Sequence, residues 1–191
     1  MYMKKILLMD FGSRFTEDIK NVLNELNISF DCVKHDYNFN ELSNEIAGII
    51  ISGSKDSVYD NGRRCDGRFL RTGVPVLGLC YGHQLVNDDF GGEVAKAKVS
   101  EMDVQIEIEI DVDNPLFDGM NHTQKVSMFH NDEVTKLGDG FISLAHGQNC
   151  KYAASYNKEF NIYSVQYHPE CKTYADYSKE YFANFAKICK I

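Results

Sequence analysis

Val74-Pro-Val-Leu-Gly-Leu-Cys-Tyr-Gly-His-Gln-Leu85 runs an apolar strand into a helix, with a cysteine at the junction. The apolar residues before Cys80 predict the strand, and the residues after it predict the helix. Gly78 and Gly82 lie two residues to either side of the cysteine. Small residues in these places permit a sharp turn that lifts a nucleophilic side chain clear of a sheet. We therefore expect Cys80 at the carboxyl edge of a sheet.

The expected turn has two chemical consequences for Cys80. A thiol at a helix N-terminus lies at the positive end of the helix dipole, which favours the thiolate. The amide N–H of Tyr81 then points to the place where an oxyanion forms when the thiolate attacks a carbonyl group. A lone cysteine is more often a packing residue, so this interpretation requires a base near Cys80.

Upstream of this turn, short apolar segments alternate with segments of helical periodicity. Strands are expected at residues 5–10, 30–33 and 48–51, and helical segments at 14–26, 42–46 and 66–72. Strands that are apolar throughout and separated by helices are typical of a parallel sheet covered on both faces. The sequence therefore predicts an α/β fold with an open, mostly parallel sheet and helices on both faces.

Downstream of Gly91-Gly92 the pattern changes. Residues 104–112 alternate strictly, with apolar residues at even positions, which predicts a half-exposed strand in an antiparallel extension at the sheet edge. Shorter strands are expected near 141–145, 152–156 and 162–166. Aromatic residues at helical spacing predict a closing helix over 174–188. We expect residues 1–191 to form one domain, because no repeat or linker interrupts the chain.

Composition and charge argue against several classes of protein. The chain has 191 residues, of which 43% are hydrophobic, and a formal net charge of −8. This charge argues against nucleic-acid binding, which needs clustered Lys and Arg. The apolar segment 6–11 is too short for a signal peptide or a membrane span, so we expect a cytoplasmic protein. The six scattered cysteines form no CxxC pair, which argues against a zinc site and a disulfide framework.

A base for Cys80 is expected from Val165-Gln-Tyr-His-Pro-Glu170. A strand delivers His168 to the same sheet edge as Cys80. Residues i and i+2 of an extended turn project to the same side, so Glu170 can orient the His168 ring. A cysteine, a histidine and a carboxylate make a complete set for acyl transfer. His168 alone would more often be structural, and its pairing with Cys80 favours the catalytic interpretation.

Together, Gly78-Leu-Cys-Tyr-Gly-His-Gln84 and Val165-Gln-Tyr-His-Pro-Glu170 resemble the paired signature motifs of class I glutamine amidotransferases. The similarity covers nearly the whole chain and is strongest to the amidotransferase domain or subunit of GMP synthases. It includes the opening strand at 6–13, the loop at 48–57, the segment 129–134 and the aromatic C-terminal helix. The resemblance implies a flavodoxin-like sheet.

The resemblance also implies an activity and a set of roles. The chain would hydrolyse L-glutamine to glutamate and ammonia, with no cofactor and no metal. Cys80 would attack the side-chain amide to form a thioester, His168 would protonate the departing ammonia, and Glu170 would orient His168. The remaining implied residues are the oxyanion donors Tyr81, Gly53 and Ser54 and the glutamine-binding residues Gln84, His130, Asn131 and Asp132.

Three segments depart from the family pattern. Gly53-Ser54-Lys55 stands where members usually have Gly-Gly-Pro, and Glu101-Met-Asp103 where Glu-Phe-Gly or Glu-Tyr-Gly is expected. Asn131-Asp132 replaces Gly-Asp. A serine at position 54 must either adopt an unusual backbone angle or let the loop sit differently.

Three functions remain open on the sequence. The first is an amidotransferase subunit that supplies ammonia for GMP synthesis to a separate ATP-dependent synthetase, which we expect because no synthetase sequence follows Ile191. The second is a free-standing hydrolase that acts on another γ-glutamyl amide. The third is a non-catalytic regulatory relative, and the presence of Cys80, His168 and Glu170 together argues against it.

Overall fold

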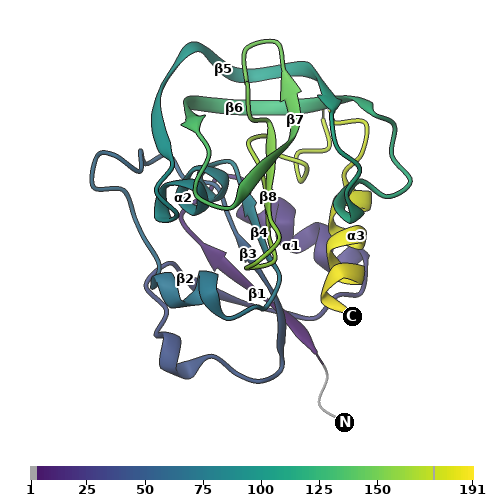
Figure 1. Cartoon of the computed structure of the whole chain (residues 1–191). Coiled ribbons are helices and arrows are strands. Elements are labelled where there is room, and N and C mark those ends of the chain that lie inside the picture. Colours follow the sequence, from purple (N-terminus) through teal and green to yellow (C-terminus); the bar gives the residue numbers. More distant parts are fainter. Residues whose placement is uncertain (1–3, 174) are drawn as a thin grey trace.

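A computed structural model describes residues 4–173 and 175–191, whose strands form one nine-stranded sheet in the order β2-β1-β3-β4-β9-β8-β7-β5-β6 (Figure 1). Five neighbouring strands pair in parallel. They are β1 (Lys5–Asp10), β2 (Phe30–Lys34), β3 (Ile46–Ile51), β4 (Val76–Leu79) and β9 (Ile162–Val165). The remaining strands are antiparallel: β5 (Glu93–Ile110), β6 (Thr123–Lys136), β7 (Phe141–Gly147) and β8 (Ala154–Asn157).

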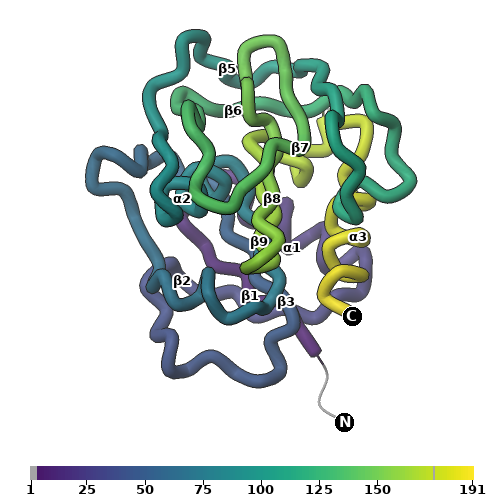
Figure 2. The backbone as a smooth tube through the Cα atoms, in the orientation of Figure 1, coloured from purple at the N-terminus to yellow at the C-terminus, as the bar shows by residue number. Residues whose placement is uncertain are grey.

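The sheet is mixed, so the expectation of a mostly parallel sheet is wrong. β5 and β6 are the longest strands, with 18 and 14 residues, and form an antiparallel ribbon. In Figure 2 this ribbon runs across the top of the molecule, above the parallel strands. β6 lies at one edge of the sheet and β2 at the other, whereas β5 pairs with both β6 and β7. The sequence did not predict β6, because Ser127, His130 and Asp132 are polar yet buried and break the alternating pattern.

Helices cover both faces of the parallel strands, as expected. Successive residues of a strand point to opposite faces, so β1 contributes to two separate hydrophobic clusters. One cluster includes residues of α1 (Thr16–Glu25) and α3 (Lys179–Cys189). The other includes residues of α2 (Tyr81–Asp89) and of the 3₁₀ helix η2 (Gly67–Arg71).

Three short elements differ from the expected ones. The helical turn expected at 42–46 is replaced by the 3₁₀ helix η1 (Phe39–Glu41), and β3 already begins at Ile46. A further 3₁₀ helix, η3 (Pro115–Phe117), follows β5. The closing helix begins at Lys179, not at 174, and Tyr174 lies outside the described residues.

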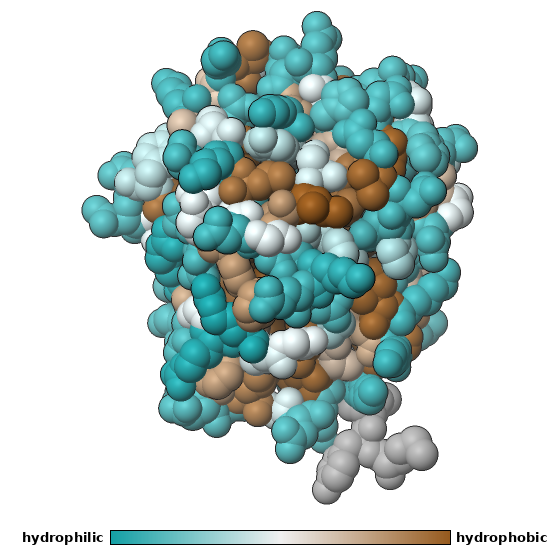
Figure 3. Space-filling model, in the orientation of Figure 1, coloured by the Kyte–Doolittle hydropathy of each residue, from teal (hydrophilic) through white to brown (hydrophobic). Residues whose placement is uncertain are grey.

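The surface carries mostly hydrophilic residues on the face shown in Figure 3, with hydrophobic residues in separate groups among them. No helix within residues 4–173 and 175–191 is long and apolar enough to cross a membrane.

One strand pairing places the expected reactive residues together. β4 and β9 are parallel neighbours, and their last residues, Leu79 and Val165, are partners in the register. The chain therefore leaves the sheet at adjacent points as it enters the segments that contain Cys80 and His168. Carboxyl ends of parallel strands at one sheet edge are a common place for ligand sites in α/β proteins.

Candidate active site

Cys80 forms the turn between β4 and α2 in a strained backbone conformation. Its φ is 52° and its ψ is −101°, a combination that is costly for a residue other than glycine. Its amide N–H donates to the carbonyl of Val165 at 2.8 Å, which ties the turn to the end of β9. Cys80 is the N-cap of α2, so the amide N–H of Tyr81 has no acceptor within the helix.

The two flanking glycines allow close packing of α2 against the sheet. A Cβ atom on Gly78 would lie 2.6 Å from the carbonyl oxygen of Gly82. One on Gly82 would lie 2.6 Å from the carbonyl oxygen of Ile51. Neither glycine has a left-handed φ, so the strain of the turn falls on Cys80 itself.

His168 interacts with both Glu170 and Cys80. The Nδ1 atom of His168 lies 2.7 Å from Oε1 of Glu170, and both side chains are buried. Burial by itself lowers the pKa of His168, but the Glu170 carboxylate and the Cys80 thiol outweigh it and raise this pKa well above its usual value. The arrangement therefore favours the imidazolium form of His168.

An aromatic pair packs against the His168 ring. The ring centre of Phe15 lies 4.7 Å from that of His168, and that of Phe129 lies 5.7 Å away. The guanidinium carbon of Arg14 lies 5.0 Å from the centre of the Phe15 ring and 5.1 Å from that of Phe129. An exposed cation therefore lies above the aromatic pair that supports the candidate base.

A cavity of about 300 Å³ opens onto Cys80 and His168. Three loops or strand segments and parts of α2 surround it. Its lining consists of residues 12–15, residues 54–57, Cys80, Tyr81, Gln84, Met102, residues 129–132 and His168. Within the described ranges, no three or more His, Cys, Asp or Glu side chains gather in a way that could hold a metal ion.

The predicted oxyanion loop lies beside the reactive pair. A Cβ atom on Gly53 would lie 3.0 Å from Cε1 of His168 and 3.7 Å from Cβ of Cys80. Ser54 lines the cavity, and its hydroxyl accepts a hydrogen bond from the amide of Asp56 at 3.2 Å. The backbone of Ser54 has no left-handed φ, so serine is accommodated here without the unusual angle.

The predicted glutamine-binding residues are tied to one another by hydrogen bonds. The Gln84 amide donates to the main-chain carbonyl of Asp132 at 2.8 Å. The Asp132 carboxylate accepts from the hydroxyls of Tyr59, at 2.7 Å, and Ser57. The Asn131 side chain accepts from Ser100 at 2.6 Å. These contacts join the β6 wall of the cavity to α2 and to the loop after β3.

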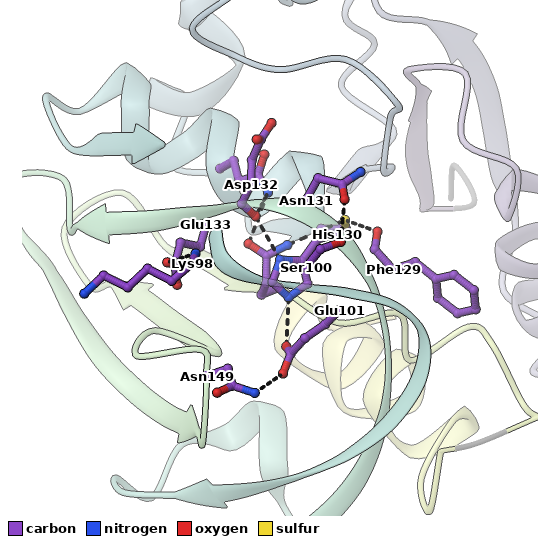
Figure 4. A network of polar contacts seen from close by, with 12 residues as sticks. Lys98, Ser100, Glu101, Phe129, His130, Asn131, Asp132, Glu133 and Asn149 are labelled. Carbon is purple, nitrogen blue, oxygen red and sulfur yellow. Dashed lines mark hydrogen bonds and ion pairs between the residues drawn. The ribbon is translucent and has the colours of Figure 1, made fainter. Parts of the chain in front are cut away.

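His130 does not present a free ring nitrogen to the cavity. Its Nδ1 lies 2.9 Å from the carbonyl oxygen of Asp132, and its Nε2 lies 3.0 Å from Oε2 of Glu101. Figure 4 shows Glu101, His130 and Asp132 joined in this way, with Asn149 on the far side of Glu101. His130 therefore lines the cavity with both ring nitrogens already bound to protein atoms.

Several residues of the site were not predicted from the sequence. Gln166 donates its amide to Sγ of Cys80 at 3.6 Å, and it belongs to the same motif as His168. Arg14 and Phe15 lie at the end of the loop that follows β1, whose carboxyl end meets the same sheet edge, and this position was a usable signal. Nothing in the local pattern indicated Phe129, because its contacts with Phe15 and His168 depend on the tertiary fold.

Comparisons with known proteins identify the family of the chain. Residues 7–189 match the family model for class-I glutamine amidotransferases. The chain is 38% identical over 189 residues to the glutamine-hydrolyzing GMP synthase of Lactobacillus johnsonii, with 97% of this chain and 36% of that protein covered. It is 39% identical over 195 residues to that of Nitratiruptor sp., with 97% and 37% covered. The chain thus spans little more than a third of the length of these relatives.

Solved structures show the same fold. A putative GMP synthase subunit from Thermoplasma acidophilum superimposes with a TM-score of 0.87 at 29% identity, covering 100% of this chain and 96% of that one. A glutamine amidotransferase from Thermotoga maritima gives a TM-score of 0.75 at 15% identity, with 100% and 84% covered. At the latter identity the likeness concerns the fold alone.

Proposed function

The chain belongs to the class I glutamine amidotransferase family, and from this premise we propose that it hydrolyses L-glutamine to glutamate and ammonia. The observation that carries the proposal is the buried chain of contacts from Cys80 through His168 to Glu170 at the cavity. A thiol, a proton carrier and an orienting carboxylate are the groups that acyl transfer requires.

The first chemical step is attack by the Cys80 thiolate on the side-chain carbonyl carbon of glutamine. The raised pKa of His168 suits its ring to hold the proton that the thiol gives up. Attack places a negative charge on the carbonyl oxygen. We assign its stabilisation to the amide of Tyr81, at the start of α2, and to the Gly53-Ser54 loop, which lies beside Cys80 and lines the cavity.

The second step releases ammonia and then glutamate. The proton on Nε2 of His168 passes to the leaving nitrogen as its bond to carbon breaks, which leaves a thioester on Cys80. His168 then takes a proton from water, and the resulting hydroxide attacks the thioester to give glutamate and the free thiol. Through both steps Glu170 accepts a hydrogen bond from Nδ1 and so fixes the direction of the other ring nitrogen.

Recognition of the amino-acid end of glutamine is assigned to the outer part of the cavity. Gln84, Asn131 and Asp132 line it and form the proposed glutamine-binding wall. Arg14 supplies an exposed guanidinium at the same cavity. Four carbon–carbon bonds of about 1.5 Å separate the amide carbon of glutamine from its α-carboxylate carbon. We place that carboxylate near Arg14, because a guanidinium binds carboxylates well.

The ammonia is proposed to pass to an ATP-dependent synthetase that makes GMP. Support comes from relatives named GMP synthase, of which this chain matches only 36% or 37%, and from the likeness to the Thermoplasma GMP synthase subunit. We propose that the synthetase is a separate partner, in keeping with the description of the Thermoplasma protein as a subunit.

The proposal is tested by measuring glutamate and ammonia release from L-glutamine. The chain is assayed alone and with a GMP synthetase that lacks its own amidotransferase segment, and Cys80→Ala is the control. Glutamine hydrolysis that rises with the synthetase is the expected result. Activity on other γ-glutamyl amides but not on glutamine would favour a free-standing hydrolase. No activity in any arm would favour a regulatory role.

A further inference from the structure

A buried polar pair lies at the cavity wall and joins β5 to β6. Glu101 and His130 are directly opposite in the strand register. Oε2 of Glu101 lies 3.0 Å from Nε2 of His130, and the two side chains are 4% and 1% exposed. Removing a carboxylate and an imidazole from water is unfavourable unless their polar atoms are paired. Burial of Glu101 and His130 therefore destabilises the fold unless their polar atoms keep their hydrogen-bond partners.

The second ring nitrogen of His130 fixes the main chain of the cavity wall. Nδ1 donates to the carbonyl oxygen of Asp132, and the Gln84 amide donates to the same oxygen. Two donors use both lone pairs of a carbonyl oxygen. A carbonyl oxygen can only accept a hydrogen bond, so Nδ1 of His130 carries the proton of this contact. His130 and Gln84 together thus set the position of the Asp132 peptide.

Further residues are hydrogen-bonded to Glu101 at one end of this network and to Gln84 and Asp132 at the other. On the outer side, the Asn149 amide donates to Oε1 of Glu101 at 3.2 Å, so both carboxylate oxygens are bound (Figure 4). On the inner side, the Gln84 amide lies 3.2 Å from Oε1 of Gln166. The Asp132 carboxylate in turn holds Ser57 and Tyr59 of the loop that continues from Ser54. Glu101 therefore holds His130, and through it the Asp132 peptide, in place.

We propose that Glu101 is a positioning residue for glutamine, acting through His130 on the Asp132 peptide; this inference rests on the proposed glutaminase function. Loss of the Glu101 carboxylate frees the His130 ring, and the wall formed by Asn131 and Asp132 relaxes. The backbone of the reactive pair is placed by β4 and β9, and its contact with β6 is through Phe129, whose carbonyl accepts from the Cys80 thiol at 3.7 Å, and not through the Asp132 peptide. Removal of Glu101 therefore weakens glutamine binding and leaves the reactivity of the thiol unchanged.

The test compares Glu101→Ala with Glu107→Ala, an exposed glutamate on the same strand. Glu101→Ala should raise KM for glutamine by about tenfold with kcat changed by less than about threefold. Glu107→Ala should leave both unchanged. Glu101→Gln should restore most of the loss, because an amide can still hydrogen-bond to His130. Glu101→Met, which fills the same space, replaces the alanine variant if that one does not fold.

Two further measurements separate the possible causes. The rate at which iodoacetamide alkylates Cys80 should be the same in the parent and in Glu101→Ala. The double variant Glu101→Ala/His130→Ala should show the same KM as either single variant, because both changes break one connection. An unchanged KM in Glu101→Ala would overturn the proposal, as would equal falls in kcat and alkylation rate.

Calorimetry separates this inference from the proposed function. Glutamine binding is measured on Cys80→Ala and on Cys80→Ala/Glu101→Ala, where no turnover intervenes. About tenfold weaker binding in the double variant supports the role of Glu101 even if the parent protein shows no hydrolysis. Equal binding by the two variants overturns it even if the parent hydrolyses glutamine.

Discussion

The cavity has two walls that are built from different kinds of strand pairing. The reactive wall follows two parallel strands of four residues each, β4 and β9, and all of their side chains are buried. The recognition wall is the antiparallel ribbon of β5 and β6, which is long and contains three register shifts. Short buried strands fix the reacting atoms, whereas the irregular ribbon carries the polar groups that face a substrate.

Two of the three departures from the family pattern lie on the recognition wall, and the third, at Ser54-Lys55, lies in the loop beside Cys80. None of them falls at Cys80, His168 or Glu170. Asp103 adopts a left-handed φ of 56° at the bulge between Met102 and Val104. The resemblance suggested glycine at this place, and aspartate is among the few other residues that tolerate the conformation. The recognition wall thus accepts sequence changes that a strained nucleophile turn would not.

The largest expected effect is on the reactive wall. Cys80→Ala removes the attacking atom and should lower glutamine hydrolysis by about 10⁵-fold or more, judged from glutamate release. The thermal unfolding temperature should change little, because the substitution removes only one buried atom. Cys32→Ala, at an exposed cysteine on β2, is the matched control and should retain activity. Substantial turnover in Cys80→Ala would show that the nucleophile is another group.

Substitution of His168, the proton carrier, should lower kcat more than substitution of Glu170, the carboxylate that orients it. His168→Ala should lower kcat by roughly 10³- to 10⁴-fold. The fall in kcat caused by Glu170→Gln should be roughly tenfold to a hundredfold smaller, because the amide oxygen can still accept a hydrogen bond from Nδ1 of His168. Steady-state kinetics on both variants provides the measurement. Equal losses would contradict the division of roles.

A second buried histidine, His83, has a pKa that is shifted in the opposite direction to that of His168. His83 of α2 lies 2.8 Å from the Ser164 hydroxyl, and burial lowers its pKa to about 3. The usual value of about 6.5 applies in the unfolded chain. Neutral His83 therefore contributes stability that is present above pH 6.5 and is lost as pH falls towards 3. The loss is roughly 5 kcal/mol at most.

Urea unfolding at pH 7 and pH 4 measures this contribution. His83→Gln has no group that titrates in this range, so its stability should fall less between the two pH values than that of the parent. His168 titrates in the opposite direction, because its pKa is raised, and does not produce an acid loss of this kind. The same fall in both proteins would rule out His83 as the source.

The smallest effect is expected at the mouth of the cavity. Arg14→Gln should raise KM for glutamine by about tenfold and leave kcat within about threefold, because the guanidinium binds the substrate and not the reacting atoms. Glutaminamide lacks the α-carboxylate, so the variant should lose most of the parent's preference for glutamine over it. Lys34→Gln, on the exposed side of β2, is the control. An unchanged preference would remove Arg14 from the substrate site.

Local patterns were enough to predict the parallel half of the fold. Apolar runs and helical spacing indicated β1, α1, β3, β4 and the turn at Cys80, all within a few residues of where they lie. The mixed character of the sheet was not predictable in this way. β6 buries polar residues such as Ser127 and His130, whose partners lie on distant segments, so its sequence does not alternate.

Prediction of the site was limited in the same way, because local patterns do not show contacts between remote segments. The expected proximity of His168 to Cys80 followed from two strand ends, and Glu170 from its spacing of two residues. The role of Arg14 above the aromatic pair and that of Glu101 behind His130 depend on contacts between remote segments. His130 was expected to bind glutamine, but both of its ring nitrogens are bound to protein atoms.

Covalent labelling tests the central claim most directly. A glutamine analogue with a chloromethyl ketone in place of the carboxamide is incubated with the protein, and the labelled peptide is identified by mass spectrometry. We predict one adduct, on Cys80, that excess L-glutamine prevents and that is absent from Cys80→Ala. Label on any of the other cysteines with Cys80 unmodified, or continued glutamine hydrolysis by fully labelled protein, would contradict the account.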